Sequence, residues 1–533
     1  MRVEYKTGID ARRAIKSGIN QVADIVKLTL GPKGSNVLVD KPYQYPVVSN
    51  DGVFIVKELQ LNDPFENLGA QAIRQVADKT NQKAGDGTTT SVVIAQKLAS
   101  EGLKYVETGL NAMDIKRGML EAKNFITEQL RILAKPVDTL EEAIQVATIS
   151  VESREIGEIV AKAIFEVGKD GVVTIEDSPS IGISTEVVDG FNFDRGFITS
   201  EFSREETVEI KDAKIIITDE KISSARQIEP IIEKLLEEGK KDLVIIADDV
   251  DAEALAMLIW NAFKGILNVV AVKAPDFGVR RTEALEDIAI LTGGNFITKS
   301  KLLSLEKMEL SDLGSAQKVK VDKDSTTIIS GNPDNKALKS HVSVLRKKVE
   351  ELKTELEKIY VKQRVAKLTK GVAIVKIGAA TEMELSYLRH KIEDAVAATK
   401  AAIEEGILPG GGVALLKSSD LFIAKETEEA WSDDFKAGAK TVINSIRAPF
   451  YQIVENCGRH DASVLANEIL LGTRGLYSGY DAKNDVLVDD MFQAGIIDPL
   501  KVTRLALENA VEITSNMLTT GAAIIQIPEE KEL

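Results

Sequence analysis

The sequence predicts a multi-domain, mainly helical protein with an α/β insertion in its middle. Its 533 residues are too many for one hydrophobic core, so two to four domains are expected. Helical periodicity dominates both ends of the chain, whereas short β-rich runs begin near Gly171. Gly190 and Gly371 bracket this middle, which the chain enters once and leaves once. We therefore interpret residues 191–370 as an insertion into a helical body, although each glycine could equally be an ordinary turn residue.

The N-terminal third reads as a series of helices. Apolar residues recur with the helical period over residues 10–30 and stop at the Gly31-Pro32 turn. A second helix is expected over about 66–81 and leads into the segment 84–91, after which a third helix begins. The helical region is expected to break at Lys135-Pro136.

The middle of the chain reads as an α/β domain. Short strands are expected at 172–175, 185–188 and 214–218. Residues 241–275 fit a βαβ unit, because two apolar runs typical of buried strands flank a helix at 251–264. Further on, apolar residues alternate at spacings of three and four over 342–359, which taken alone predicts one long helix or a coiled coil. The last third of the chain returns to helices.

Composition excludes several classes of function. The net charge of −16 argues against nucleic acid or an anionic membrane as a bulk partner. No uncharged apolar run approaches the ~20 residues that span a bilayer, and the first residues lack the apolar stretch of a secretory signal. The single cysteine, Cys457, suits a reducing compartment, so we expect a cytoplasmic protein. The three histidines lie far apart in the sequence, which makes a zinc site improbable.

The segment 84–91, Ala-Gly-Asp-Gly-Thr-Thr-Thr-Ser, is the strongest chemical signal. Two glycines allow tight turns beside Asp86, and three threonine hydroxyls stand where a helix begins. A helix N-terminus attracts anions, whereas Asp86 would repel a phosphate unless a cation lay between them. The segment therefore suggests a metal–triphosphate site. The alternative is a helix capped by threonine after a glycine turn, and no Walker motif decides between the two.

Two helices carry further candidate groups. Asp394 lies about 200° around its helix from Ile392 and is therefore presented away from the apolar stripe, free to reach a site on another domain. The alternative is a solvated carboxylate beside Glu393.

Helix 251–264 has apolar residues over more than half of its circumference, so part of that surface should face a partner or water unless the helix is fully buried.

Nine further short motifs follow one another along the chain. They are 29–34 (TLGPKG), 50–52 (NDG), 65–70 (FENLGA), 193–196 (FDRG), 272–275 (VKAP), 291–294 (LTGG), 393–395 (EDA), 410–412 (GGG) and 498–504 (DPLKVTR). Together with 84–91, this ordered set resembles the group I chaperonins, the bacterial GroEL type, up to about residue 527.

The resemblance implies a chaperonin fold with three domains. A helical equatorial ATP-binding domain would comprise 1–132 and 405–533, and a small α/β intermediate domain 133–189 and 372–404. An α/β apical domain, 190–371, would bind clients and a co-chaperonin. The resemblance also implies that the segment 342–359 is two antiparallel helices with a break near Lys353–Glu355.

The resemblance implies the function as well: an ATPase that folds unfolded client proteins inside two stacked seven-subunit rings closed by a GroES-type lid. It assigns Asp394 to catalysis with Asp51 in support, Asp86 to Mg²⁺, and ATP and K⁺ as further cofactors. Nucleotide contacts would come from Thr29, Leu30, Gly31, Pro32, Asn50, Asp86, Gly87, Thr88, Thr89, Thr90, Gly411, Asp481, Ala482, Lys483 and Asp498. Client contacts would come from Phe197, Phe202, Ile231, Ile232, Leu255, Ile259 and Trp260, on a groove between helix 251–264 and a helix at about 223–238.

Several positions depart from the family pattern. Asn50 replaces a usual lysine, and Asp481 replaces a usual asparagine, so an acceptor-only carboxylate stands where an amide could both donate and accept. Glu201 and Glu229 stand where apolar groove residues are usual, and the chain ends without the usual Gly-Gly-Met tail. Two other classes of protein remain: an ATP-using α/β enzyme with 191–370 as a small-molecule domain, and a ring scaffold with weak ATPase.

Overall fold

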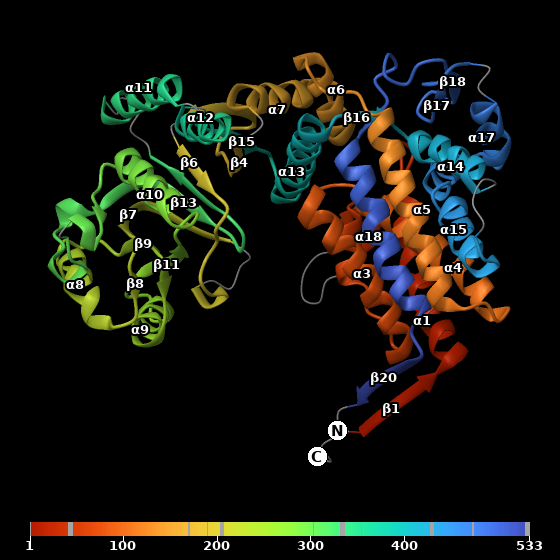
Figure 1. Ribbon diagram of the computed structural model, residues 1–533, viewed down its shortest axis with the longest axis horizontal. Coiled ribbons are helices and arrows are strands. Elements are labelled where there is room, and N and C mark those ends of the chain that lie inside the picture. The colour runs from red at the N-terminus through yellow and green to blue at the C-terminus, as the bar shows by residue number, and fades with distance from the viewer. Residues whose placement is uncertain are drawn as a thin grey trace. The chain divides into compact units, whose positions relative to one another are not determined.

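The computed structural model describes residues 2–40, 46–168, 171–188, 190–202, 207–301, 303–330, 336–352, 354–369, 371–426, 431–471 and 474–527. It forms two compact units, Met1–Lys162 with Ala380–Leu533, and Ala163–Ala379. The chain thus leaves the first unit once and returns once, as an insertion does (Figure 1). The predicted intermediate domain, 133–189 and 372–404, is shared between the two units, so the three-domain division remains a prediction. The missing tail motif falls outside the described residues.

The first unit is mainly helical. Its helices are α1 (Gly8–Val26), α2 (Gly52–Glu58), α3 (Pro64–Ala84), α4 (Thr88–Glu107), α5 (Ala112–Leu133), α6 (Leu140–Val151), α13 (Glu382–Glu405), α14 (Val413–Glu426), α15 (Asp433–Ser445), α16 (Ala448–Asn456), α17 (Ala462–Leu470) and α18 (Leu500–Leu518). α7 (Arg154–Val167) crosses the boundary between the units. Four antiparallel strand pairs complete the unit: β1 (Arg2–Thr7) with β20 (Ala522–Ile527), β2 (Val37–Val39) with β3 (Val47–Ser49), β16 (Ile407–Pro409) with β19 (Ile497–Pro499), and β17 (Gly479–Asp481) with β18 (Val486–Val488).

A mainly aliphatic core holds this helical body together. The long helices α3, α4, α5 and α18 run side by side (Figure 1), and α1 and α15 pack against them. Their buried stripes consist mostly of Ala, Val, Ile and Leu, as the low aromatic content predicts. The helix predicted at 10–30 is α1 followed by a 3-10 turn, Lys27–Thr29, and the helix predicted at 66–81 is α3, which extends to the glycine turn.

The second unit is built on a seven-stranded mixed sheet. Its strands lie in the order β11 (Asn268–Lys273), β9 (Asp242–Ala247), β7 (Val208–Thr218), β13 (Gly314–Val321), β14 (Thr326–Ile329) and β6 (Gly190–Phe193), and β12 (Phe296–Ile297) pairs with β7. Strands β11, β9 and β7 are parallel. Two smaller sheets accompany it. One has three strands in the order β4 (Val172–Asp177), β15 (Val372–Gly378) and β5 (Gly182–Val188), and the other is a short pair, β8 (Lys221–Ile222) with β10 (Asp249–Val250).

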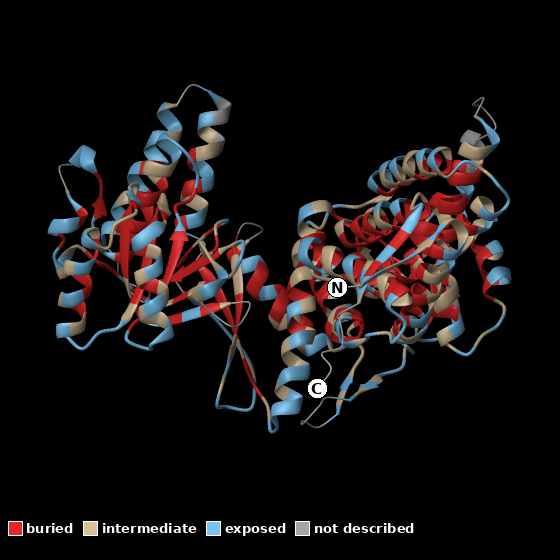
Figure 2. Ribbon diagram, turned by 90° about the horizontal axis from the view of Figure 1, so that it is seen from below, coloured by how far each residue is buried: buried red, intermediate tan, exposed pale blue. Residues whose placement is uncertain are grey.

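Helices cover both faces of the seven-stranded sheet. Along β7 and β9 alternate residues point to opposite faces, so Ile215 and Val244 belong to one core and Ile216 and Leu243 to the other. The first core lies under α10 (Val279–Thr292), α11 (Lys336–Glu351) and α12 (Glu355–Thr369), and the second under α8 (Glu229–Glu237) and α9 (Ala252–Phe263). The buried residues form the red interior of each unit in Figure 2.

Two of the predicted helices differ from those in the structure. The segment 342–359 belongs to two helices, α11 and α12, so the single long helix is wrong and the break is confirmed. The helix expected over about 223–238 is shorter than predicted, because residues 225–227 form a 3-10 turn and α8 begins at Glu229, just before Pro230. None of the described helices has the length and apolar character needed to cross a membrane.

Candidate functional site

A tight loop between α3 and α4 presents Asp86. Gly85 and Gly87 have φ angles of 70° and 79°, a region that favours glycine. A Cβ on Gly85 would lie 2.2 Å from the Cβ of Ala397 on α13, and a Cβ on Gly87 would lie 2.4 Å from Cγ1 of Val502 on α18. Two later helices therefore pack directly against the loop, and only glycine permits that contact.

The start of α4 is left uncapped by side chains. Gly87 is its N-cap and makes no side-chain cap hydrogen bond, so the amides of the first turn, Thr88–Thr90, remain available to an anion. The threonine-capped alternative is therefore wrong. The hydroxyls of Thr29 and Thr89 lie 3.4 Å apart, which brings the 29–32 turn to the same place.

Asp51 comes to this place from α2. Its carboxylate accepts hydrogen bonds from the amides of Val53 at 2.9 Å and Phe54 at 3.3 Å, so it caps the helix and is held in a defined orientation. A Cβ on Gly52 would lie 2.5 Å from the Thr89 hydroxyl, so α2 meets the start of α4 closely. Asn50, which precedes this cap, is half-buried.

Asp394 is partly buried on α13 and shares a region of negative charge with two other carboxylates. Burial, followed by the charges of Asp86 and Asp51, raises the pKa of Asp394 well above its usual value. Burial also raises the pKa of Asp86, and the charge of Asp51 adds to that rise. The alternative of a freely solvated Asp394 is therefore wrong. Asp394 also lies within the same compact unit as the glycine loop and not on a separate one.

Asp498 is the fourth carboxylate of this site and, like the other three, is half-buried. It stands on β19 opposite Leu408, and it accepts hydrogen bonds from the backbone amides of Gly411 and Gly412. Burial and the charge of Asp86 raise the pKa of Asp498 to about 7 in spite of those two donors. A Cβ on Gly411 would meet no atom within 4 Å, so open space lies beside this residue.

The segment Asp481–Lys483 is a turn closed by its own side chain. One oxygen of Asp481 accepts from the amides of Lys483 at 2.9 Å and Asn484 at 3.0 Å, and the other accepts from the Asn484 side chain at 2.7 Å. Ala482 is buried, and its carbonyl accepts a hydrogen bond from Cys457. The Asp481 carboxylate is thus occupied within its own loop.

Two residues near the site were missed by the sequence analysis. Lys391 stands one turn before Asp394; burial opposes its charge, but the hydrogen bond to Glu152 (2.9 Å) raises the pKa of Lys391. The side-chain amide of Asn456 donates to the carbonyls of Lys27 at 2.9 Å and Leu30 at 2.8 Å and holds the 29–32 turn. The spacing of Lys391 from Asp394 could have been noticed, whereas Asn456 carries no sequence signal.

The site holds more negative than positive side chains, with four carboxylates near one lysine, and this excess favours binding of a cation. The charge of Asp51 raises the pKa of Asp86 and Asp394, and the charge of Asp86 raises the pKa of Asp394 and Asp498. Lys391 opposes the rise in the pKa of Asp86 and Asp394. Among the described residues no group of three or more carboxylate, imidazole or thiol side chains is arranged to hold a metal alone. Mg²⁺ commonly binds through one or two carboxylates together with phosphate oxygens, and the donor set around Asp86 fits that pattern.

A separate apolar groove lies in the second unit. It has a volume of about 930 Å³ and is lined mainly by α9, with Phe202, Leu255, Ile259 and Trp260 among its walls and Glu201 on its edge. The buried stripe of α9 consists of Ala254 and Leu258, whereas Trp260 is 60% and Phe263 72% exposed. The fully buried alternative for helix 251–264 is therefore wrong.

Three predicted groove residues lie elsewhere. Ile231 and Ile232 on α8 are buried against the sheet, because these two positions form the apolar stripe of that short helix. Phe197 is half-buried, bridges to Val272 and packs on the opposite core, so it does not line the groove. Glu229 is exposed at the start of α8.

Comparison with known proteins places this geometry in a family. The model of the TCP-1/cpn60 chaperonin family matches residues 22–528. Among solved structures, the chain is similar to the chaperonin gp146 from the bacteriophage EL 2 (Pseudomonas aeruginosa), determined in the presence of ATP-BeFx. The TM-score is 0.72 at 19% identity, over 98% of this chain and 99% of that chain, which establishes a common fold. The chain belongs to the TCP-1/cpn60 chaperonin family.

Proposed function

We propose that this chain is the subunit of an ATP-hydrolysing, protein-folding chaperonin of the group I, GroEL type, working in the cytoplasm. The observation that carries the proposal is the meeting of Asp51, Asp86, Asp394 and Asp498 around an uncapped helix start. A half-buried group of carboxylates beside free amides suits a nucleoside triphosphate that arrives with its cations.

Hydrolysis of a phosphoanhydride depends mainly on positioning and charge neutralisation. Backbone amides at Thr88–Thr90 would hold the phosphates, the turn Thr29–Pro32 and Asn50 would close over them, and Asp498 would accept from the ribose hydroxyls. Open space beside Gly411 leaves room for the nucleoside. Since the Asp481 carboxylate is engaged in its own turn, the base would contact Ala482 and Lys483 mainly through packing and main-chain groups.

Asp394 would orient and deprotonate the attacking water, and Asp51 would support it. Burial makes the Asp394 carboxylate more basic than an exposed one, which favours proton acceptance from water. Mg²⁺ held by Asp86 would neutralise phosphate charge, and K⁺ would add to that neutralisation.

The apolar groove on α9 would capture unfolded clients and, in turn, a GroES-type lid. An exposed Trp260 and Phe263 beside half-buried Leu255 and Ile259 offer apolar area that an unfolded chain can cover. Glu201 makes this groove more acidic than an all-apolar one, so clients that combine apolar and basic residues should be favoured.

Assembly into rings is supported by exposed apolar residues on two-stranded sheets. On β1 and β20, Tyr5 is 70% and Ile524 63% exposed, and on β2 and β3, Leu38 is 68% and Val48 50% exposed. Two-stranded sheets are marginal alone, and their open edges invite pairing with another chain. We infer self-association through these strands, and two stacked seven-subunit rings from the family resemblance.

The test combines native mass and ATP turnover on the purified full-length chain. A particle many times the subunit mass that hydrolyses ATP with Mg²⁺ is the expected result. A small, stable monomer or dimer would favour the α/β enzyme, and a large ring without turnover would favour the scaffold; either result would contradict the proposal.

A further inference from the structure

The helical hairpin α11–α12 is strongly basic in an acidic protein. Residues 336–370 hold eleven lysines and arginines and four glutamates, a net charge of +7 in a chain whose total is −16. Neither the nucleotide site nor the α9 groove uses these residues. The charge is therefore unexplained by the proposed function.

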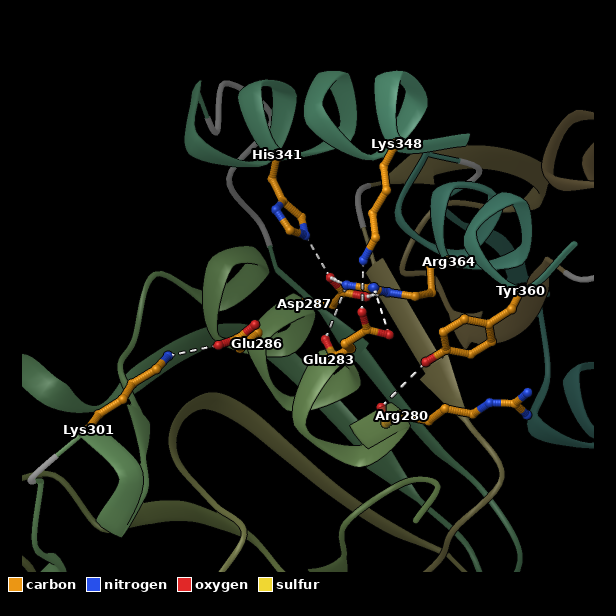
Figure 3. Close-up of polar contacts among 9 residues, drawn as sticks. All are labelled: Arg280, Glu283, Glu286, Asp287, Lys301, His341, Lys348, Tyr360 and Arg364. Atoms are coloured by element: carbon orange, nitrogen blue, oxygen red, sulfur yellow. Dashed lines mark hydrogen bonds and ion pairs between the residues drawn. The ribbon is translucent and has the colours of Figure 1, made fainter. Parts of the chain in front are cut away.

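The cations on the inner side of the hairpin are neutralised by α10 (Figure 3). Asp287, with no exposed side-chain surface, accepts from Nε of Arg364 at 2.8 Å and lies 2.7 Å from Nε2 of His341. Glu283 contacts Arg364 and Lys348, each at 3.1 Å. These contacts hold both helices against α10. They also engage Glu283 and Asp287 with cations that point toward α10.

Four exposed cations of the hairpin have no such partners. Lys336, Arg346, Lys347 and Lys362 are all exposed, and no carboxylate of the described residues lies within ion-pair distance of any of them. Val344, 59% exposed, lies on the same helix as the first three. We call the exposed surface that carries Lys336, Arg346, Lys347 and Lys362 the basic face. Its charges add up locally, because none of them forms an ion pair within the described chain and the hairpin holds eleven lysines and arginines against four glutamates.

A short acidic segment of a protein fits the basic face better than a nucleic acid does. The described part of the hairpin has no exposed aromatic side chain on which a base could stack, since Tyr360 is half-buried and lies under Arg280, 4.7 Å from its ring centre. A long polyanion would also extend over the negatively charged remainder of the chain. A short segment would interact electrostatically only with the hairpin, because salt screens charges beyond about 8 Å at physiological ionic strength.

We propose that the basic face of the α11–α12 hairpin is a docking surface for acidic, Glu/Asp-rich segments of other proteins. It is a second interaction surface on the unit that carries the α9 groove, of opposite chemistry. The binding requires neither ATP turnover nor the groove, so it stands or fails independently of the proposed function.

The test is fluorescence anisotropy of a labelled 16-residue Glu/Asp/Gly/Ser peptide with the full-length assembled protein. The peptide has no apolar residues, so the groove cannot hold it. Binding should weaken as NaCl rises from 50 to 500 mM. The variant R346Q/K347Q/K362Q should bind roughly tenfold more weakly, because each exposed ion pair contributes a few-fold.

Matched controls separate this surface from others. Lys211 and Lys307 are exposed on the same unit and lie outside the hairpin, so K211Q/K307Q should bind the peptide as wild type does, and so should Trp260→Ser. Unchanged circular dichroism would verify folding. The proposal would be overturned if the triple variant bound as tightly as wild type, if the peptide failed to bind at low salt, or if a 16-nucleotide single-stranded RNA bound the basic face more tightly than the peptide.

Discussion

The carboxylate site proposed to bind the nucleotide and the α9 groove differ in the kind of group that each holds. In the first unit, carboxylates are half-buried close to one another, and closely packed glycines hold the loops that carry them. In the second unit, apolar groups are exposed on a helix whose other stripe is firmly buried. Each site holds groups in an environment that disfavours them. The proposed ligands, cations and phosphates in one case and an apolar chain in the other, would relieve that unfavourable environment on binding.

The largest expected effect is on hydrolysis. Asp394→Ala should slow ATP turnover by a factor of about 100 or more, because the water loses its orienting base, while nucleotide affinity stays near wild type. Steady-state turnover and equilibrium ATP binding measure the two effects. The neighbouring Glu393 is exposed, so Glu393→Ala is the matched control and should turn over as wild type does. Wild-type turnover of Asp394→Ala would contradict the assignment.

The half-buried carboxylate Asp498 should also affect the pH dependence of stability. Because the pKa of Asp498 is raised to about 7 in the folded state, its contribution to stability is present at low pH and is lost as pH rises from about 4 to 7. The nucleotide-free protein should therefore lose up to about 4 kcal/mol over that range from this group. Asp498→Asn should flatten this part of the curve in denaturant unfolding. An identical slope in wild type and variant would show that Asp498 is not the cause.

On the other side of the comparison, Trp260→Ser should weaken capture of a denatured client by about tenfold, since apolar area is lost from the groove. Its folding stability should change little, because the side chain is 60% exposed. Leu258→Ala is the contrasting control: this residue is buried beneath the same helix, and its truncation should cost about 2–5 kcal/mol. If Trp260→Ser unfolds the second unit, Trp260 is a core residue and the groove is misplaced.

The smallest expected effect is a difference in stability between two glycine variants, which separates steric crowding from backbone strain. Gly85→Ala and Gly109→Ala both place a Cβ at positive φ, which costs about 1–2 kcal/mol. Only at Gly85 would the new Cβ also meet another residue, Ala397, whereas nothing lies within 4 Å at Gly109. Gly85→Ala should therefore be the less stable and should also weaken ATP binding. Equal stability and equal ATP affinity in the two variants would argue against close packing of α13 on the loop.

The sequence predicted what depends on local pattern. Strand β7, helix α9 and the glycine loop at Asp86 follow from apolar periodicity and from residues that tolerate tight turns. The break between α11 and α12 followed only from the family resemblance, because no Gly or Pro marks it and both helices continue one apolar pattern.

The sequence could not predict what depends on packing between distant segments. Ile231 and Ile232 are apolar in either environment, and only the short length of α8 and its position on the sheet show that they are buried. The charge of Asp86 raises the pKa of Asp394 and of Asp498, although these three residues lie more than a hundred residues apart in sequence. Asn456 holds the 29–32 turn from a similar distance.

The most direct test of the account follows a labelled, denatured client bound to the full-length protein after ATP and Mg²⁺ are added. The client is expected to stay bound without nucleotide, and fluorescence anisotropy is expected to fall after ATP is added, because the proposed function uses ATP to process the client that the groove captures. A client that leaves equally fast without ATP, or that stays bound however much ATP is hydrolysed, would contradict the account.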